Sequence, residues 1–215
     1  MDDHYPVYLK LDNKKCLVVG GGAIAERKVK ALLDCAAKVF VVSPQFTTWL
    51  EESAAEKKIT AIRRNYATTD LENAFLVIGA TDDELTNCRV AEECQERNVL
   101  VNIVDDQAKC SFIVPAILRQ GSLSISIATE GKSPMLARRI REELTPTFGP
   151  EYREFLELMD SVRDHVLRTV PEQGKRRDLF ERLVYSDIIE LIREGQHEKV
   201  KERITHVLGS GWTQS

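Results

Sequence analysis

A glycine-rich turn near the start of the chain carries residue types that can hold phosphate groups. Gly20, Gly21 and Gly22 follow an apolar run at residues 16–19 and precede a stretch of helical periodicity that begins near Ile24. Gly20 supplies the backbone angles of a tight turn, and Gly22 lets the main chain approach a pyrophosphate. Because free N–H groups at the positive end of a helix favour anions, the turn predicts a dinucleotide site. A purely structural turn is the alternative.

The ends of two further predicted strands offer contacts to the same cofactor. One strand ends at Ser43-Pro44-Gln45, where an acidic residue commonly holds the adenosine ribose. No Asp, Glu or Arg stands there, so this position leaves NAD and NADP open, although the Ser43 hydroxyl can still bond a ribose. Another strand ends at Ala80-Thr81, small residues that let a nicotinamide ribose pass close to the main chain. A simple helix cap is the alternative.

A carboxylate follows the fifth predicted strand, at Asp105. Since ligands of doubly wound sheets bind outside the carboxyl ends of the strands, Asp105 is expected beside the reactive end of a nicotinamide, and Asn102 of the same strand is expected to contact the cofactor. A carboxylate there can accept a proton during a hydride transfer. An aspartate after a strand is also a common turn residue, and position alone does not decide between the two roles.

A basic helix is expected after Ser133, because Ser133-Pro134 reads as an N-cap followed by proline at the first helical position. The cationic residues of this helix are Arg138, Arg139 and Arg141, and Lys132 and Lys109 are expected to join them. The three arginines lie off the apolar stripe of the helix or at its border. Together these charges predict a rim for a polyanionic substrate, and a solvated helix face is the alternative.

The elements that position these residues follow from the hydrophobic pattern. Short β-rich runs alternate with helical stretches up to about residue 105, which indicates an α/β fold with a Rossmann-like parallel sheet and helices on both faces. The expected strands are Leu17–Gly20, Val39–Val42, Ile59–Arg63, Phe75–Ala80 and Leu100–Val104. The expected helices are Ile24–Asp34, Thr47–Lys57 and Leu85–Arg97. Residues 6–11 are expected to add an antiparallel edge strand.

After residue 105 the pattern changes. Two runs, Phe112–Leu118 and Leu123–Ala128, predict a β-hairpin whose apolar face a second subunit would cover. The basic helix follows. The rest of the chain predicts a small helical C-terminal module, with helices at residues 152–166, Leu179–Arg193 and Lys199–Leu208 and interruptions at Pro171 and Gly174.

Composition narrows the class of protein. The 215 residues carry a net charge of −4, which argues against a general affinity for nucleic acid. No apolar run approaches the ~20 residues that cross a bilayer, and the polar start lacks a signal-peptide pattern, so a cytoplasmic protein is expected. Five cysteines include no C-x-x-C pair and four histidines are scattered. Neither a metal site nor a disulfide framework is therefore expected.

Taken together, five segments in a fixed order resemble the precorrin-2 dehydrogenase family, of the type found at the N-terminus of siroheme synthases. The segments are residues 16–28, 80–83 with Asn87, 101–105, 111–116 and 131–138. The resemblance implies an NAD-binding Rossmann domain at residues 1–112, a dimerisation hairpin and helix at residues 113–148, and a helical C-terminal module at residues 149–215. It also implies a homodimer.

The resemblance further implies a reaction and roles for individual residues. The reaction removes a hydride and a proton from precorrin-2 in an NAD-dependent step and gives sirohydrochlorin, and Asp105 matches the residue regarded as the general base. The residues that match the lining of the NAD site are Ala23, Ile24, Pro44 and Gln45. Thr129 matches a hydroxyl residue that faces the tetrapyrrole. The carboxylate arms of that substrate would meet Lys132, Ser133, Arg138, Arg139 and Arg141.

Three alternatives stay open. The first is a bifunctional dehydrogenase and ferrochelatase, on which no sequence feature decides. The second is a nucleotide-sensing regulatory domain, which shares the Rossmann half but gives no reason for residues 131–138 or the basic helix. The third is a dimerisation scaffold with an inactive nucleotide site, which predicts no NAD binding.

Overall fold

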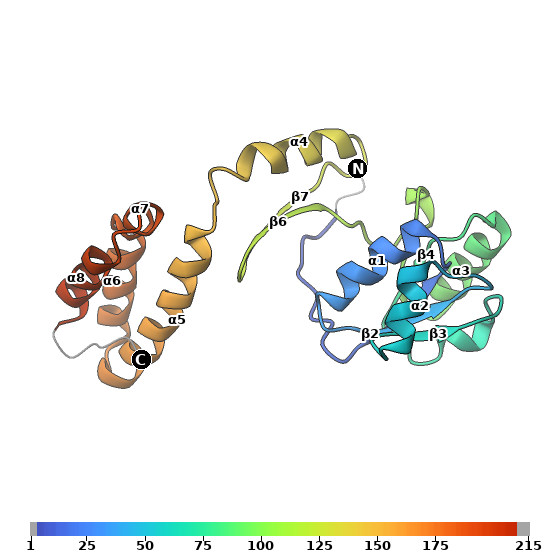
Figure 1. The fold of residues 1–215 in the computed structure, drawn as a ribbon, viewed down its shortest axis with the longest axis horizontal. Helices are drawn as coiled ribbons and strands as arrows, with labels where there is room; N and C mark the ends of the chain where they lie inside the picture. The colour runs from blue at the N-terminus through green and yellow to red at the C-terminus, as the bar shows by residue number, and fades with distance from the viewer. Residues whose placement is uncertain (1–3, 210–215) are drawn as a thin grey trace. The chain divides into compact units, whose positions relative to one another are not determined.

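Residues 4–209 are described by the computed structural model (Figure 1). Contacts within the chain divide the protein into two units, Met1–Val114 and Pro115–Ser215. The first unit carries a parallel sheet, and the second carries a β-hairpin and helices. No helix in the described range is both long and apolar enough to cross a bilayer.

The sheet of the first unit has five parallel strands in the order β3-β2-β1-β4-β5. Their bounds are β1 Lys15–Val19, β2 Lys38–Val42, β3 Thr60–Ile62, β4 Leu76–Gly79 and β5 Leu100–Ile103. The last residues of neighbouring strands are paired in register, so all five strands end in one row. The loops that follow the strands therefore meet at a single edge, as the sequence predicts.

Helices cover both faces of this sheet, which confirms the predicted fold class. The helical elements of the first unit are α1 Ala23–Leu33, α2 Thr48–Ala55, η1 Thr68–Leu71, α3 Glu84–Glu96 and η2 Gln107–Lys109. Successive side chains of a strand point to opposite faces. Cys16 and Val18 accordingly lie in the core with α1 and α2, whereas Leu17 and Val19 lie in the core with α3.

The N-terminal segment does not form the expected edge strand. Residues 4–11 have no strand assignment, because the chain turns at Asn13 directly into β1 in the middle of the sheet. β1 is already paired with β2 on one side and β4 on the other, which leaves no free edge for an antiparallel neighbour. The Asn13 N–H instead donates to the Ala36 carbonyl at 3.1 Å, and Leu11 is buried in the core.

The second unit begins with the predicted hairpin, but its first strand begins at Ala116 and not at Phe112. Strands β6 (Ala116–Gln120) and β7 (Leu123–Ile127) pair antiparallel, and Gly121 at φ +59° makes the turn between them. Helix α4 (Pro134–Leu144) packs against both strands. The predicted start of this helix is confirmed, because the Ser133 hydroxyl accepts a hydrogen bond from the Leu136 N–H at 3.2 Å.

Up to residue 209, four more helices follow in the second unit and share one apolar core. They are α5 Glu151–Thr169, α6 Gln173–Val184, α7 Ile188–Arg193 and α8 His197–Leu208. The expected continuous helix over Leu179–Arg193 is wrong: α6 ends at Val184 and α7 begins at Ile188 with Asp187 as its N-cap residue. Between the two helices the Ser186 hydroxyl accepts from the Ile188 N–H at 3.3 Å. Gly174, expected as an interruption, lies inside α6.

Candidate functional site

Two of the three glycines in the turn between β1 and α1 are required by packing. Gly20 has φ +122°, and a Cβ atom there would lie 2.1 Å from the Ala80 carbonyl oxygen. A Cβ on Gly21 would lie 1.9 Å from the Gln45 carbonyl oxygen. These glycines let the loops after β2 and β4 close on the turn, which brings the three predicted contact segments of the cofactor together.

Gly22 differs from its two neighbours. It is the N-cap residue of α1 at φ −84° and makes no side-chain cap, and a Cβ atom there would meet nothing within 4 Å. Neither backbone strain nor packing explains this glycine. What its missing side chain does provide is access to the free N–H groups of the first turn of α1, where a pyrophosphate binds best. Ala23 and Ile24 are exposed at the same helix end.

The loop after β2 rests on the glycine turn. The Thr47 N–H donates to the Gly21 carbonyl at 3.0 Å, and the Thr47 hydroxyl donates to Glu26 of α1 at 2.7 Å. The Ser43 side chain is nearly buried, and its hydroxyl accepts from the Gln45 N–H at 3.4 Å. Ser43 thus braces the loop, while Pro44 and Gln45 are exposed at the sheet edge.

Sequence reasoning missed a cation beside this loop. Arg63 follows β3, and its guanidinium lies 5.2 Å from the centre of the Phe46 ring. It also forms an ion pair with Glu51 in the first turn of α2, with 2.5 Å between the nitrogen and oxygen atoms. The sequence contains a signal for it, because β3 neighbours β2 in such sheets and the residue after β3 therefore lies beside Ser43-Pro44-Gln45.

The loop after β4 is fixed from beneath by a buried amide. Asn87 of α3 donates from Nδ2 to the Thr81 carbonyl at 2.9 Å. Asn87 Oδ1 is buried without a hydrogen-bond partner among the described residues. The Thr81 hydroxyl accepts from the Asp83 N–H at 3.2 Å, and Asp83 caps α3. The loop after β4 therefore does form the helix cap that was the alternative. Ala80 and Thr81 are half-buried at the edge of the sheet where the strands end.

Asp105 occupies a tight turn directly after β5. The Asp106 N–H donates to the Ile103 carbonyl at 3.4 Å, and Asp105 adopts φ +62°. Asparagine and aspartate are among the few residues other than glycine that adopt this left-handed region with any frequency. The side chain is exposed. Asp105 is therefore a turn residue, as the alternative predicts. The same turn places its carboxylate at the edge of the sheet where the strands end.

Cys110 and Asn102 hold this turn from inside. The Cys110 thiol accepts from the Ile103 N–H at 3.2 Å and lies 3.1 Å from the Asp106 carbonyl oxygen. Asn102 donates from Nδ2 to the Phe112 carbonyl at 3.0 Å and to the Cys110 sulfur at 3.4 Å. Asn102 therefore uses its amide N–H groups within the protein, and burial raises the pKa of the Cys110 thiol.

Two lysines lie near the turn, in different electrostatic settings. Lys109 forms ion pairs with Asp106 and Glu84, which raise the pKa of its ammonium group and engage it within the protein. Lys28 of α1 is half-buried. Burial and the neighbouring Arg27 lower the pKa of Lys28, and the charge of Asp105 acts in the opposite direction.

In the second unit the residues expected to contact substrate surround a short irregular loop. Thr129 accepts at its hydroxyl from the Ser133 N–H at 3.1 Å and at its carbonyl from the Lys132 N–H at 2.9 Å. Glu130 and Gly131 adopt φ +49° and +74°. The loop thus brings Thr129, Lys132 and the N-terminus of α4 together.

The arginines of α4 form ion pairs along their own helix. Arg138 pairs with Glu142 at 2.8 Å, Arg139 pairs with Glu143 at 2.7 Å, and Arg141 lies 3.4 Å from Glu142. The sequence left two interpretations of these arginines, a cationic rim for substrate and a solvated helix face. Ion pairs along the helix are typical of a solvated face. An anionic ligand would have to compete with the two glutamates, which is feasible because exposed ion pairs of this kind contribute little.

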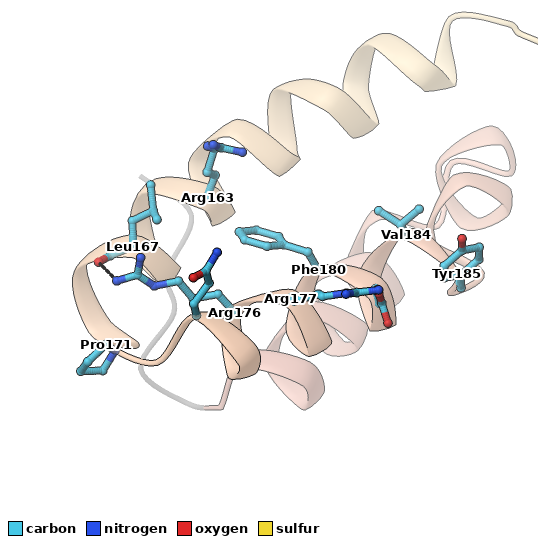
Figure 2. Close-up of a pocket in the computed structure, with 10 residues that line it drawn as sticks. Arg163, Leu167, Pro171, Arg176, Arg177, Phe180, Val184 and Tyr185 are labelled. Carbon is cyan, nitrogen blue, oxygen red and sulfur yellow. Dashed lines mark hydrogen bonds and ion pairs between the residues drawn. The ribbon is translucent and has the colours of Figure 1, made fainter.

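A pocket of about 770 Å³ lies between α5 and α6 (Figure 2). Its lining includes Arg163, Arg176, Arg177 and Phe180, and Arg176 donates to the Leu167 carbonyl at 3.2 Å. None of the predicted site residues lines this pocket. Within residues 4–209, no three His, Cys, Asp or Glu side chains are grouped so that they could hold a metal ion.

Comparison with known families divides the chain into three matched regions. Residues 7–116 match the family described as "Putative NAD(P)-binding". Residues 120–145 match "Sirohaem biosynthesis protein central", and residues 151–208 match "Sirohaem synthase dimerisation region". The first region contains the sheet and its edge loops, so the matched fold includes a nicotinamide-dinucleotide-binding domain.

Curated relatives and a solved structure resemble the chain over most of its length. A siroheme synthase of Pseudoalteromonas translucida (strain TAC 125) is 36% identical over 207 residues, which are 96% of this chain and 44% of the relative. A siroheme synthase of Thioalkalivibrio sulfidiphilus (strain HL-EbGR7) is 35% identical over 97% of this chain and 43% of the relative. The chain therefore spans less than half the length of these relatives. The structure described as "SirC, precorrin-2 dehydrogenase" superposes with a TM-score of 0.81 at 26% identity, covering 95% of this chain and 98% of the other.

Proposed function

The chain belongs to the precorrin-2 dehydrogenase family of the siroheme synthase N-terminal type, and from this membership we propose that it oxidises precorrin-2 to sirohydrochlorin with NAD. The single structural observation that carries the proposal, for its cofactor, is Gly22. Its missing side chain leaves the N-terminus of α1 open at the edge where all five strands end. Such an opening fits a pyrophosphate and has no use in packing.

We assign the cofactor to the loops after β1, β2 and β4, to the first turn of α1 and to Asn102 of β5. The residues of the proposed cofactor site are Gly20, Gly22, Ala23, Ile24, Ser43, Pro44, Gln45, Ala80, Thr81 and Asn102. The free N–H groups of α1 would bind the pyrophosphate, and the loop after β2 would meet the adenosine ribose. For Ser43 and Asn102 the contribution is indirect, because their side chains brace the loops through internal hydrogen bonds. When bound, NAD supplies an acceptor for the hydride.

Asp105 is the proposed general base. Oxidation of the macrocycle releases a hydride and a proton, and the exposed Asp105 carboxylate accepts the proton. The turn between Ile103 and Asp106 holds this carboxylate outside the sheet, and Cys110 keeps the two ends of the turn together. A base positioned in this way typically contributes about 10²–10⁴-fold to the rate.

Substrate contacts are proposed for the loop before α4 and for the basic face of that helix. The residues are Thr129, Lys132, Ser133, Arg138, Arg139 and Arg141. The chemistry of the substrate supports these contacts, because precorrin-2 carries several carboxylate arms and arginine binds a carboxylate through two parallel hydrogen bonds. A homodimer is proposed from the matched dimerisation region. The cytoplasmic location expected from the sequence stays a prediction.

The test is anaerobic turnover. Purified protein is mixed with enzymatically prepared precorrin-2 and NAD, and absorption spectra follow the formation of sirohydrochlorin and of reduced cofactor. The proposal expects one reduced cofactor for each sirohydrochlorin formed, with NADP replacing NAD poorly. Binding of NAD without any turnover would favour a nucleotide-sensing domain, and absence of NAD binding would favour a scaffold.

A further inference from the structure

The ion pair between Arg63 and Glu51 lies where the adenosine end of a dinucleotide would bind. Ser43 at the end of β2 donates its N–H to the Ile62 carbonyl at the end of β3 at 3.1 Å, so the residues after the two strands are neighbours. Arg63 is the first residue after β3, and Phe46 belongs to the loop after β2. The adenosine ribose of a dinucleotide lies at this loop in doubly wound sheets.

Arg63 has the chemistry that recognises a ribose 2′-phosphate. Arginine near the end of the second strand is the usual partner of that group in NADP-binding proteins, and its planar fork can bind two phosphate oxygens at once. The side chain is more than half exposed, at 58%, and it lies over the Phe46 ring. This stacking orders the guanidinium beside the loop without burying its charge.

Glu51 limits which ligands Arg63 can bind. Its carboxylate lies 2.5 Å from the Arg63 guanidinium and is fixed on the first turn of α2. A 2′-phosphate brought to Arg63 would approach the Glu51 carboxylate as well, and like charges at short range repel. A ribose 2′-hydroxyl carries no charge and suffers no such penalty.

We propose that the Arg63–Glu51 pair selects NAD over NADP, with Glu51 as the residue that rejects the 2′-phosphate. The inference rests on the proposed dinucleotide site, and it names the residues that make this site specific for NAD. It predicts that removing the Glu51 charge turns Arg63 from a paired cation into a phosphate-binding one.

The experiment measures dissociation constants of NAD and NADP by calorimetry, so that it needs no substrate. Glu51→Gln is expected to improve NADP binding relative to NAD by about tenfold at low salt, because a repulsive charge near the phosphate is removed. The double variant Glu51→Gln with Arg63→Gln is expected to lose that gain. Glu52→Gln is the matched control, since it makes the same charge change on the same helix without an ion pair to Arg63.

The outcomes separate this inference from the proposed function. A wild-type protein that binds NAD, together with a Glu51→Gln variant whose NADP-to-NAD ratio shifts no more than that of Glu52→Gln, overturns the inference and leaves the cofactor site standing. A wild-type preference for NADP also overturns it. Failure of the wild type to bind either dinucleotide contradicts the proposed function itself.

Discussion

Asp105 adopts a backbone conformation that most side chains avoid, in the turn that Cys110 bridges. We expect Asp105→Asn to lower turnover of precorrin-2 by about 10²–10⁴-fold, the usual contribution of a general base. Asparagine has the same shape and also tolerates a positive φ, so the turn should persist. Steady-state kinetics should therefore show a lower kcat with an unchanged KM for NAD.

Asp82→Asn is the control for this prediction. Asp82 is an exposed aspartate on the loop after β4, at the same edge of the sheet. Its replacement removes an equal charge and should leave turnover close to that of the wild type. If Asp105→Asn retained full kcat, or if both variants lost activity equally, proton transfer to Asp105 would have no place in the mechanism.

At the level of elements, one buried carboxylate ties η1 to the end of β3. Asp70 is 5% exposed and accepts two hydrogen bonds from Arg64, at 2.6 and 2.8 Å, and one from the Ala67 N–H at 2.9 Å. Burial alone would raise the pKa of Asp70, but the bonds from Arg64 and Ala67 outweigh it and lower the pKa. Stability from this group is therefore present above the unfolded-state pKa and is lost as pH falls through the folded-state pKa.

This contact predicts a pH-dependent loss of stability. At neutral pH, Asp70→Asn should reduce the free energy of unfolding by about 1–2 kcal/mol, a range that allows for solvent screening of the half-exposed Arg64. The difference from the wild type should shrink as the pH is lowered through the acid range. Urea unfolding at several pH values measures it, with the exposed Glu72→Gln as control. A constant difference at all pH values would contradict the assigned charge state.

The parallel sheet could be predicted because its strands read as short apolar runs between helical periods, and the pairing of strand ends then follows from the topology. The predictions of two elements were wrong, and each has a physical reason. Residues 6–11 have strand-like composition but no free edge beside β1, and the helix break after Val184 depends on a local hydrogen bond of Ser186. The contacts of Arg63 join residues that follow different strands, and Cys110 holds the Asp105 turn from seven residues beyond Ile103, so neither contact can be predicted from a single strand end.

At the level of the whole molecule, the matched dimerisation region covers residues 151–208, which are all of α5 to α8, whereas the sequence predicts dimerisation through the hairpin and helix at residues 113–148. We expect the protein to sediment at twice its chain mass of 24.4 kDa. Apolar side chains remain exposed in this region, including Tyr185 at 87% and Val184 at 48%, and a subunit interface is one way to cover such surface. Sedimentation equilibrium that fits a monomer at every concentration would contradict a stable homodimer.

The open N-terminus of α1 is the feature on which the whole account depends, and Gly22→Asp tests it most directly. Aspartate is a favoured N-cap residue and suits the positive end of a helix, so thermal stability should not fall. Its carboxylate would occupy the proposed pyrophosphate site and repel the phosphates. Calorimetric titration with NAD should show one site per chain in the wild type and binding weaker by about tenfold or more in Gly22→Asp. Equal affinities in the two proteins, or no binding by the wild type, would contradict the account.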